Sequence, residues 1–174
     1  GRKACGRSMP VMPTAGRAIF LFISCKGVRI SGISMRNSAL WNQHYLDCED
    51  VIVEHIHVFN HCNGNNDGID IDGCRRFILS DSVIDSDDDG IVLKSTGLAP
   101  CEDVVINNCI VSSFANAIKC GTESTGGYKN IVISNCIVKP SCNKGGPHYK
   151  IYSKRYYGYF FGGGGWWNNG WRVY

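Results

Sequence analysis

Short runs of β-branched and other apolar residues recur along the chain at a nearly constant spacing. They occupy residues 28–30, 51–53, 77–79, 104–106 and 131–133, so successive runs start 23, 26, 27 and 27 residues apart. The frame around the runs also repeats, most clearly in residues 103–111 (DVVINNCIV) and 130–138 (NIVISNCIV). A period in the twenties with short strands and no helical periodicity predicts a solenoid. Because the chain lacks the Leu-x-x-Leu-x-Leu frame of leucine-rich repeats, we predict an all-β parallel β-helix of about five coils.

A second strand is predicted in three successive coils, where residues 68–72, 90–94 and 117–121 align without gaps. Strand alternation then predicts which side chains point inward. They are Ile69, Ile71, Ile91, Leu93, Ile118 and Cys120. The outward side chains form two columns, one of Asp70, Val92 and Lys119 and the next of Asp72, Lys94 and Gly121.

Several of the ten cysteines fall into register with this repeat. Cys25, Cys48, Cys74 and Cys101 each lie three residues before an apolar run, and Tyr128 takes that position in the last repeat. Cys109 and Cys136 are also equivalent to each other. Equivalent positions on successive coils stack about 4.8 Å apart, so we interpret these cysteines as buried ladders, with disulfides as the alternative. Free thiols of this kind indicate no particular redox compartment.

Three acidic residues are brought together by the same alignment. Extended backwards by one residue, it stacks Asp67, Asp89 and Asn116, and one residue earlier it places Asp88 in line with residues 66 and 115. We therefore expect Asp67, Asp88 and Asp89 at one turn, just before the outward-facing strand. Repulsion among three carboxylates should raise at least one pKa. One proton-donating acid beside ionised carboxylates is what glycoside hydrolysis requires.

The spacing of these acids resembles that of the polygalacturonase family, glycoside hydrolase family 28. The motif Asn65-x-Asp67 is followed, 21 residues after Asp67, by the pair Asp88-Asp89 and then by IVLKS at residues 91–95. The resemblance extends over residues 18–143 and implies a right-handed parallel β-helix. It also implies inverting hydrolysis of α-linked galacturonate polysaccharide, such as pectin, with no metal or other cofactor. Carried over by position, Asp88 is the general acid, while Asp67 and Asp89 activate water on the other face of the sugar.

Two positions depart from the family pattern. The family's Gly-His-Gly motif corresponds to residues 115–117, where Asn116 replaces the histidine. Its later Arg-x-Lys pair, which holds a substrate carboxylate, has no match in residues 140–155, so we expect Lys119 to supply that cation. The candidate substrate-binding residues are Asn65, Asp70, Lys94, Asn116, Lys119 and His44.

Some of these residues have a second interpretation. Asp70, Asp72 and Lys94 are either substrate contacts or a solvated charge ladder in which Lys94 neutralises Asp72. His44 is either a residue of the cleft or a hydrogen-bonded turn residue. Residues 85–90 mimic the first half of an EF-hand loop, but the twelfth position is Thr96 and the flanks are strands, so we expect no calcium site there.

A metal site formed by His55, His57, His61 and Cys62 is also conceivable. Ligands on a single strand rarely converge without partners elsewhere. We therefore expect surface or turn histidines.

Two other classes of function remain open beside hydrolysis. One is a β-helix polysaccharide lyase in which clustered Asp residues hold Ca²⁺. The other is a carbohydrate-binding or inert solenoid without catalysis. A lyase would be distinguished by an ultraviolet-absorbing product and by loss of activity in the presence of a chelator.

Charge and hydropathy exclude other partners. Residues 1–143 contain 13 basic and 15 acidic residues, and the remaining five basic residues all follow position 143. A folded body without a basic stripe does not indicate a nucleic-acid binder. Because no run of about 18 apolar residues exists, we expect no membrane span. We expect a monomer whose partner is a polysaccharide.

Three segments are expected along the chain: an irregular one at 1–17, the β-helix at 18–143 and a non-repetitive tail at 144–174. Residues 156–174 contain nine aromatic residues and six glycines without period 2 or 3.6. Read one nucleotide later, this tail is compatible with another β-helix coil, so we hypothesise a frameshifted translation. Residues 1–16 lack the apolar segment of a secretory signal. The family resemblance nevertheless implies a secreted or periplasmic protein.

Overall fold

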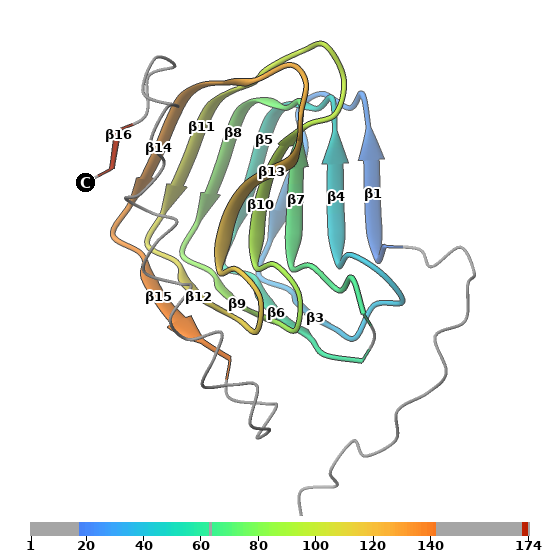
Figure 1. The fold of residues 1–174 in the computed structure, drawn as a ribbon, viewed down its shortest axis with the longest axis vertical. Coiled ribbons are helices and arrows are strands. Elements are labelled where there is room, and N and C mark those ends of the chain that lie inside the picture. Colours follow the sequence, from blue (N-terminus) through green and yellow to red (C-terminus); the bar gives the residue numbers. More distant parts are fainter. Residues whose placement is uncertain (1–17, 63, 142–171, 174) are drawn as a thin grey trace, which may run out of the picture.

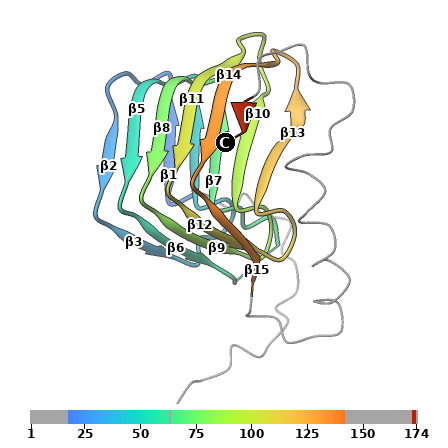
Figure 2. The same cartoon turned by 90° about the vertical axis from the view of Figure 1, so that its left-hand side faces the viewer.

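Three parallel β-sheets wind into a right-handed β-helix of about five coils in the computed structural model (Figures 1 and 2). The structure describes residues 18–62, 64–141 and 172–173. Each coil gives one strand to each sheet, so neighbours in a sheet lie three strands apart in the sequence, with the pair of β14 and β16 as the exception. The predicted fold class is therefore confirmed. None of the described residues forms a helix long and apolar enough to cross a membrane.

Sheet A contains the first strand of every coil. Its strands are β1 (Phe20–Ile23), β4 (Gln43–Leu46), β7 (Ile69–Asp72), β10 (Ile91–Ser95) and β13 (Ile118–Ser124). Ile69, Ile91 and Ile118 are aligned across three strands, which is the register that the sequence predicted.

Sheets B and C contain the second and third strands of each coil. Sheet B consists of β2 (Arg29–Ser31), β5 (Glu49–Glu54), β8 (Arg75–Ser80), β11 (Cys101–Asn107), β14 (Tyr128–Ser134) and β16 (Arg172–Val173). Sheet C consists of β3 (Ser34–Arg36), β6 (His57–Asn60), β9 (Val83–Ser86), β12 (Ile110–Ser113) and β15 (Ile137–Pro140). The apolar runs of the repeat lie in register in sheet B, as expected.

The core fills the interior of the helix with aliphatic and aromatic side chains from all three sheets. Ile69, Ile71, Ile91, Leu93 and Ile118 are buried, as the alternation predicted. Cys120 was expected inside but is exposed. It lies on β13, the last strand of sheet A. An inward side chain is covered by the side chains of the neighbouring coils. Within the described chain, no further strand of sheet A follows β13, so Cys120 lacks this cover on one side.

The predicted burial of the cysteine ladders is confirmed for Cys48, Cys74, Cys101 and Cys109, whereas Cys25 and Cys136 are only partly buried. Cys48, Cys74 and Cys101 are buried in the core, and Cys101 lies in register with Tyr128. All eight described cysteines are free, so the disulfide alternative is wrong for them. Cys5 and Cys142 lie outside the described residues.

The turn between sheets B and C uses left-handed backbone in every coil. Gly32, His55, Asp81, Asn108 and Asn135 occupy this position with φ between 52° and 70°. Asn and Asp tolerate this conformation better than most residues. His55 is therefore a turn residue, and His57 at the start of β6 is exposed, as expected.

The segment boundaries predicted for the two ends of the chain fall largely outside the described residues. Of the predicted tail, only Arg172 and Val173 are described, and they pair with Val132 and Ile133 of β14. The frameshift hypothesis stays a prediction.

Candidate active site

The three acids lie where the chain passes from sheet C into sheet A. Asp67 precedes β7, and Asp88 and Asp89 precede β10. The Gly68 amide donates to the Asp89 carbonyl at 2.9 Å, which ties the two turns together. A glycine is needed at 90 because a Cβ there would lie 2.5 Å from the Ala117 carbonyl oxygen. The turns thus stack at the spacing of the coils.

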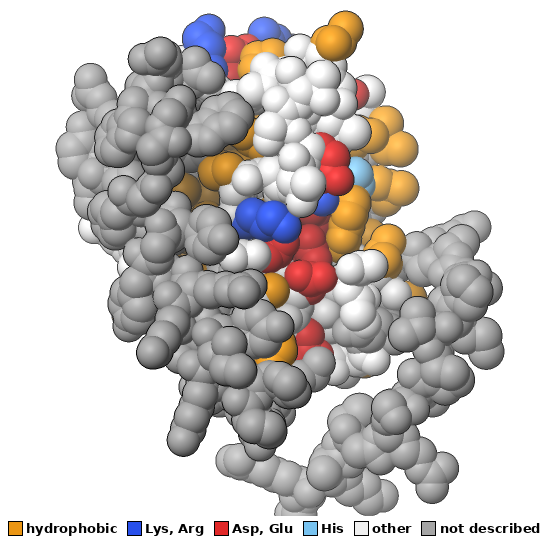
Figure 3. All heavy atoms as spheres, in the orientation of Figure 1, with side chains coloured by type: hydrophobic (Ala, Val, Ile, Leu, Met, Phe, Trp, Pro, Cys, Tyr) orange, Lys and Arg blue, Asp and Glu red, His pale blue; other side chains and the backbone are white. Residues whose placement is uncertain are grey.

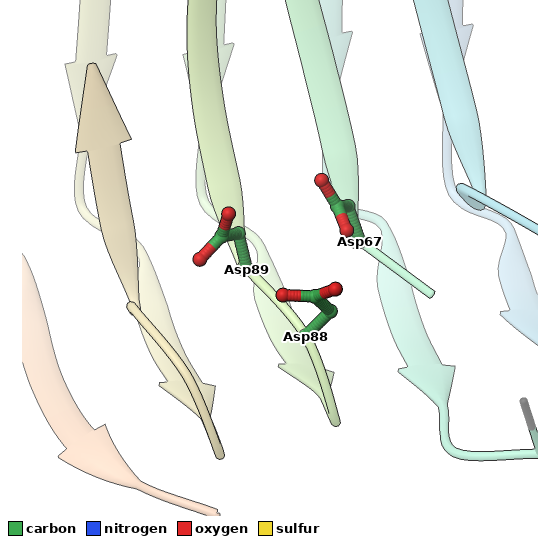
Figure 4. A group of neighbouring side chains, drawn as sticks. All are labelled: Asp67, Asp88 and Asp89. Atoms are coloured by element: carbon green, nitrogen blue, oxygen red, sulfur yellow. The ribbon is translucent and has the colours of Figure 1, made fainter. Parts of the chain in front are cut away.

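The side chains of Asp67, Asp88 and Asp89 lie close together at this pair of turns (Figure 4). One oxygen of each lies within 4.8 Å of one oxygen of the other two. Asp67 and Asp89 are 4% and 3% exposed, whereas Asp88 is half-buried. Asp88 is therefore the most accessible of the three.

Burial and mutual repulsion shift the protonation of this trio. Burial, followed by the charges of Asp88 and Asp89, raises the pKa of Asp67 to about 7. Burial, followed by the charge of Asp89, also raises the pKa of Asp88. Repulsion between the carboxylates was expected from the sequence to raise these pKa values. Repulsion does contribute, but burial is the larger cause. Such closely coupled acids hold a proton as a group.

Asp89 receives hydrogen bonds from the next coil. Asn116 Nδ2 donates to Asp89 Oδ1 at 2.6 Å, and Lys119 Nζ donates to Asp89 Oδ2 at 2.7 Å. Burial opposes the charge of Lys119, but its contacts with Asp89 raise the pKa of the ammonium. Two sequence candidates thus contact the trio directly.

Buried polar groups hold the turn that carries Asp88, and the sequence analysis did not single them out. Asn66 Oδ1 accepts from the Asp88 amide at 3.2 Å, and Asn66 Nδ2 donates to the Asn60 carbonyl at 2.9 Å. Ser86 Oγ donates to the carbonyls of Asp88 and Asp89 at 2.9 and 3.0 Å. The stacking of Asn66 beneath Asp88 was the available signal. Asn65 itself is exposed with φ of 50°.

Asp70, Asp72 and Lys94 do not form the solvated ladder that was one of their two interpretations. All three side chains are buried. Lys94 Nζ lies 3.4 Å from Asp70 Oδ1 and 3.2 Å from Glu123 Oε2, so it does not neutralise Asp72. The prediction of a solvated ladder is wrong because the outward side chains of adjacent coils cover one another and exclude solvent. Figure 3 shows acidic and basic side chains gathered on this face.

Asp72 is instead satisfied by His44 and Thr96. The Thr96 amide and hydroxyl donate to Asp72 at 2.8 and 2.7 Å, and His44 Nε2 lies 3.3 Å from Asp72 Oδ2. Burial opposes ionisation of Asp72, but these contacts lower its pKa. His44 lies in β4, in register with Asp70, so it is a strand residue of the outward face and not a turn residue.

His61 is not a surface histidine. Its side chain is 7% exposed, with Nδ1 at 2.8 Å from Asp87 Oδ1 and Nε2 at 3.1 Å from Asp85 Oδ1. Burial opposes protonation, but the two carboxylates raise the pKa of His61 to about 9. Asp85 and Asp87 of the EF-hand-like segment are therefore engaged by an imidazole. No sequence pattern indicates this contact, because the partners are 24 and 26 residues apart.

Within the described residues, Asp67, Asp88 and Asp89 form the one group of three side chains placed closely enough to share a metal ion. Lys119 already lies against Asp89, which adds positive charge where a cation would bind. His55, His57 and Cys62 contribute to no such group.

Comparison with known proteins gave consistent matches. No family model matches the chain. The chain is 27% identical over 95 residues to a polygalacturonase of Arabidopsis thaliana and 31% identical over 94 residues to a polygalacturonase of Persea americana. These matches cover 53% of the chain and span about a fifth of each relative, 21% and 20%.

A solved structure shares the fold. It is a hyperthermoactive exopolygalacturonase from Thermotoga maritima, with a TM-score of 0.60 and 27% identity. The match covers 67% of the chain and 30% of that enzyme. In both sequence and fold, the chain is therefore polygalacturonase-like, with the right-handed parallel β-helix that its motifs implied.

Proposed function

We propose that the chain carries the acid/base site of a glycoside hydrolase that cleaves α-linked galacturonate polysaccharide of the pectin type. The observation that carries this proposal is the trio of carboxylates within 4.8 Å at adjacent turns, in a chain whose relatives are named polygalacturonases. Glycoside hydrolysis needs one protonated and one ionised carboxyl. A trio that holds a proton near neutral pH meets that need.

Asp88 is the proposed general acid. It is the most accessible of the three, and its backbone is fixed by Asn66 and Ser86. Asp67 and Asp89 are the proposed groups that activate water. Asp67 shares the proton of the trio with Asp88, so activity should fall as the pH rises above about 7.

An inverting outcome is part of the proposal. Inverting enzymes separate the acid and base carboxyls by about 6.5–9.5 Å, and retaining enzymes by about 5–5.5 Å. The 4.8 Å limit joins single nearest oxygens, so it measures a shorter distance than the one between carboxyl groups. The anomer of the first product decides the matter, because inversion of an α-linkage releases a β-anomer.

The proposed substrate contacts lie on the outward face of sheet A and at the turns before it. They are Asn65, Asp70, Lys94, Asn116, Lys119 and His44. Lys119 is 31% exposed beside Asp89, which suits a cation that holds a uronate carboxylate next to the reacting bond. We further propose a monomer that acts outside the cytoplasm. Light scattering should give about the 19.2 kDa of one chain.

The test is release of reducing ends from polygalacturonate and from rhamnogalacturonan. Asp88→Asn should lower release by about a hundredfold or more, because it removes the proton donor. Asp103→Asn is the matched control, since Asp103 is exposed at a left-handed position within β11 and contacts only Asn130 at the same position of the next coil among the hydrogen bonds of its side chain in the described chain. A folded parent chain that releases no reducing ends from either polymer would refute the proposal. Unsaturated products that disappear with a chelator would identify a lyase instead.

A further inference from the structure

Lys94 is a nearly buried cation held by side chains from three other coils. Its side chain is 8% exposed on β10, with Asp70 of β7 at 3.4 Å and Glu123 of β13 at 3.2 Å. The ring of Trp41, which precedes β4, lies 4.0 Å from Nζ. A cation removed from water to this degree needs an anionic partner at all times.

The two carboxylates beside Lys94 differ in accessibility. Asp70 is completely buried, and no hydrogen bond reaches either of its oxygens within the described chain. Burial raises the pKa of Asp70 well above its ordinary value, which favours its neutral form. The side chain of Glu123 is 47% exposed and caps Lys94 from the solvent side. A hydrogen bond from the backbone of Glu123 itself lowers the pKa of its carboxyl against the effect of burial, and the contact with Lys94 lowers it further.

Lys94 belongs to the same face as the catalytic trio. Its neighbour Val92 is in register with Asp70 and with Lys119, which contacts Asp89. The charge of Lys94 also acts on Asp67 and Asp88. A sugar bound at the trio therefore lies near the cap that Glu123 forms.

We propose that Lys94 is a binding subsite for a saccharide carboxylate and that Glu123 is an internal carboxylate that occupies it until substrate displaces it. This inference rests on the proposed function and names a specificity device for it. Moving an exposed partner of an ion pair costs little. A uronate carboxylate restores the charge that Glu123 withdraws, whereas a neutral sugar has no anion to displace Glu123 and leaves the pair of Lys94 and Glu123 in place. The subsite therefore selects uronate-containing chains against neutral ones.

Equilibrium binding tests this inference separately from turnover. Trigalacturonate and neutral galactotriose are titrated into the chain by calorimetry at low salt, in an Asp88→Asn background that prevents hydrolysis. Glu123→Gln should tighten trigalacturonate binding about two- to fivefold, because the competing carboxylate is gone, and should leave galactotriose binding unchanged. Glu102→Gln is the control, since Glu102 pairs with Lys129 on sheet B.

Lys94→Met should weaken trigalacturonate binding at least tenfold and abolish the effect of Glu123→Gln. Unchanged or weaker trigalacturonate binding by Glu123→Gln overturns the inference, and this variant keeps the buried pair of Lys94 and Asp70 intact. An equal gain for galactotriose also overturns it. If the parent releases reducing ends while Glu123→Gln has no effect, the subsite fails and the proposed function stands. If trigalacturonate binding responds as expected but the parent releases no reducing ends, the subsite stands and the proposed function fails.

Discussion

His61 should make the stability of the β-helix depend on pH. Its imidazole lies between Asp85 of β9 and Asp87 of the following turn, with the Phe59 ring centroid 4.4 Å away. The pKa of His61 is raised from 6.5 to about 9. A histidine with a raised folded-state pKa stabilises the fold fully below its unfolded pKa, and this stabilisation is lost as the pH rises through the folded value. The window is therefore pH 6.5 to 9.

The size of the effect follows from the shift. The rise in the pKa of His61 from 6.5 to about 9 corresponds to at most about 3 kcal/mol of folding free energy. The lowered pKa of Asp85, where burial is opposed by the His61 contact, reports the same interaction and is not added. A loss of about 3 kcal/mol lowers the Tm of a chain of this size by about 6–12 °C.

His61→Gln removes the charge while keeping a side chain of similar reach. Thermal unfolding followed by circular dichroism should show a Tm lowered by up to that amount at pH 6, and a difference that closes near pH 10. His57→Gln is the control, because His57 is exposed on the neighbouring strand β6. A Tm difference of the same size at both pH values would refute the electrostatic reasoning and leave packing as the cause.

Two further predictions concern the turns that carry the trio. Asp67→Asn should stabilise the chain by about 1–3 kcal/mol at pH 8 and by little at pH 4, because the raised pKa of about 7 means that ionisation of Asp67 costs stability as the pH rises from 3.8 to 7; chemical denaturation at both pH values measures this, and no gain at pH 8 contradicts it. Gly90→Ala should lower stability by about 1–3 kcal/mol and reduce turnover, since its Cβ would meet the Ala117 carbonyl oxygen at 2.5 Å. Gly97→Ala is its control, with nothing within 4 Å, and equal losses in both variants would contradict the steric argument.

The sequence was sufficient for the fold and for the meeting of the three acids because both follow from one repeat. Once residues 68–72 and 90–94 are aligned, register alone brings Asp67 and Asp89 onto adjacent turns. The inward positions Ile69 and Ile91 follow from alternation within each strand. Cys120 shows the limit of that argument, because burial of an inward side chain also depends on the coil that covers it.

Contacts between outward side chains could not be predicted in the same way. The sequence places Lys94 directly beside Asp72, yet its long side chain lies against Asp70, and Asp72 accepts bonds from Thr96. Alternation tells which face a side chain occupies and not where a flexible chain of four methylenes ends. The contact of His61 with Asp87 could not be predicted for a related reason. His61 lies beyond the end of β6, where strand register does not place side chains.

The charge balance of the outward face of sheet A and its leading turns is what sets this surface apart from an ordinary solvated sheet. Six carboxyl groups are crowded there with two lysines. The acids are Asp67, Asp70, Asp72, Asp88, Asp89 and Glu123, and the lysines are Lys94 and Lys119. Crowding of buried acids beyond their cations destabilises a fold unless protons make up the difference. Burial raises the pKa of Asp67, Asp70 and Asp88, which favours their protonated forms. A rigid β-helix that retains proton-bearing carboxyls beside a half-buried Asp88 has the chemical requirements for general acid catalysis, and this surplus of acid is a stronger argument for hydrolysis than any single motif.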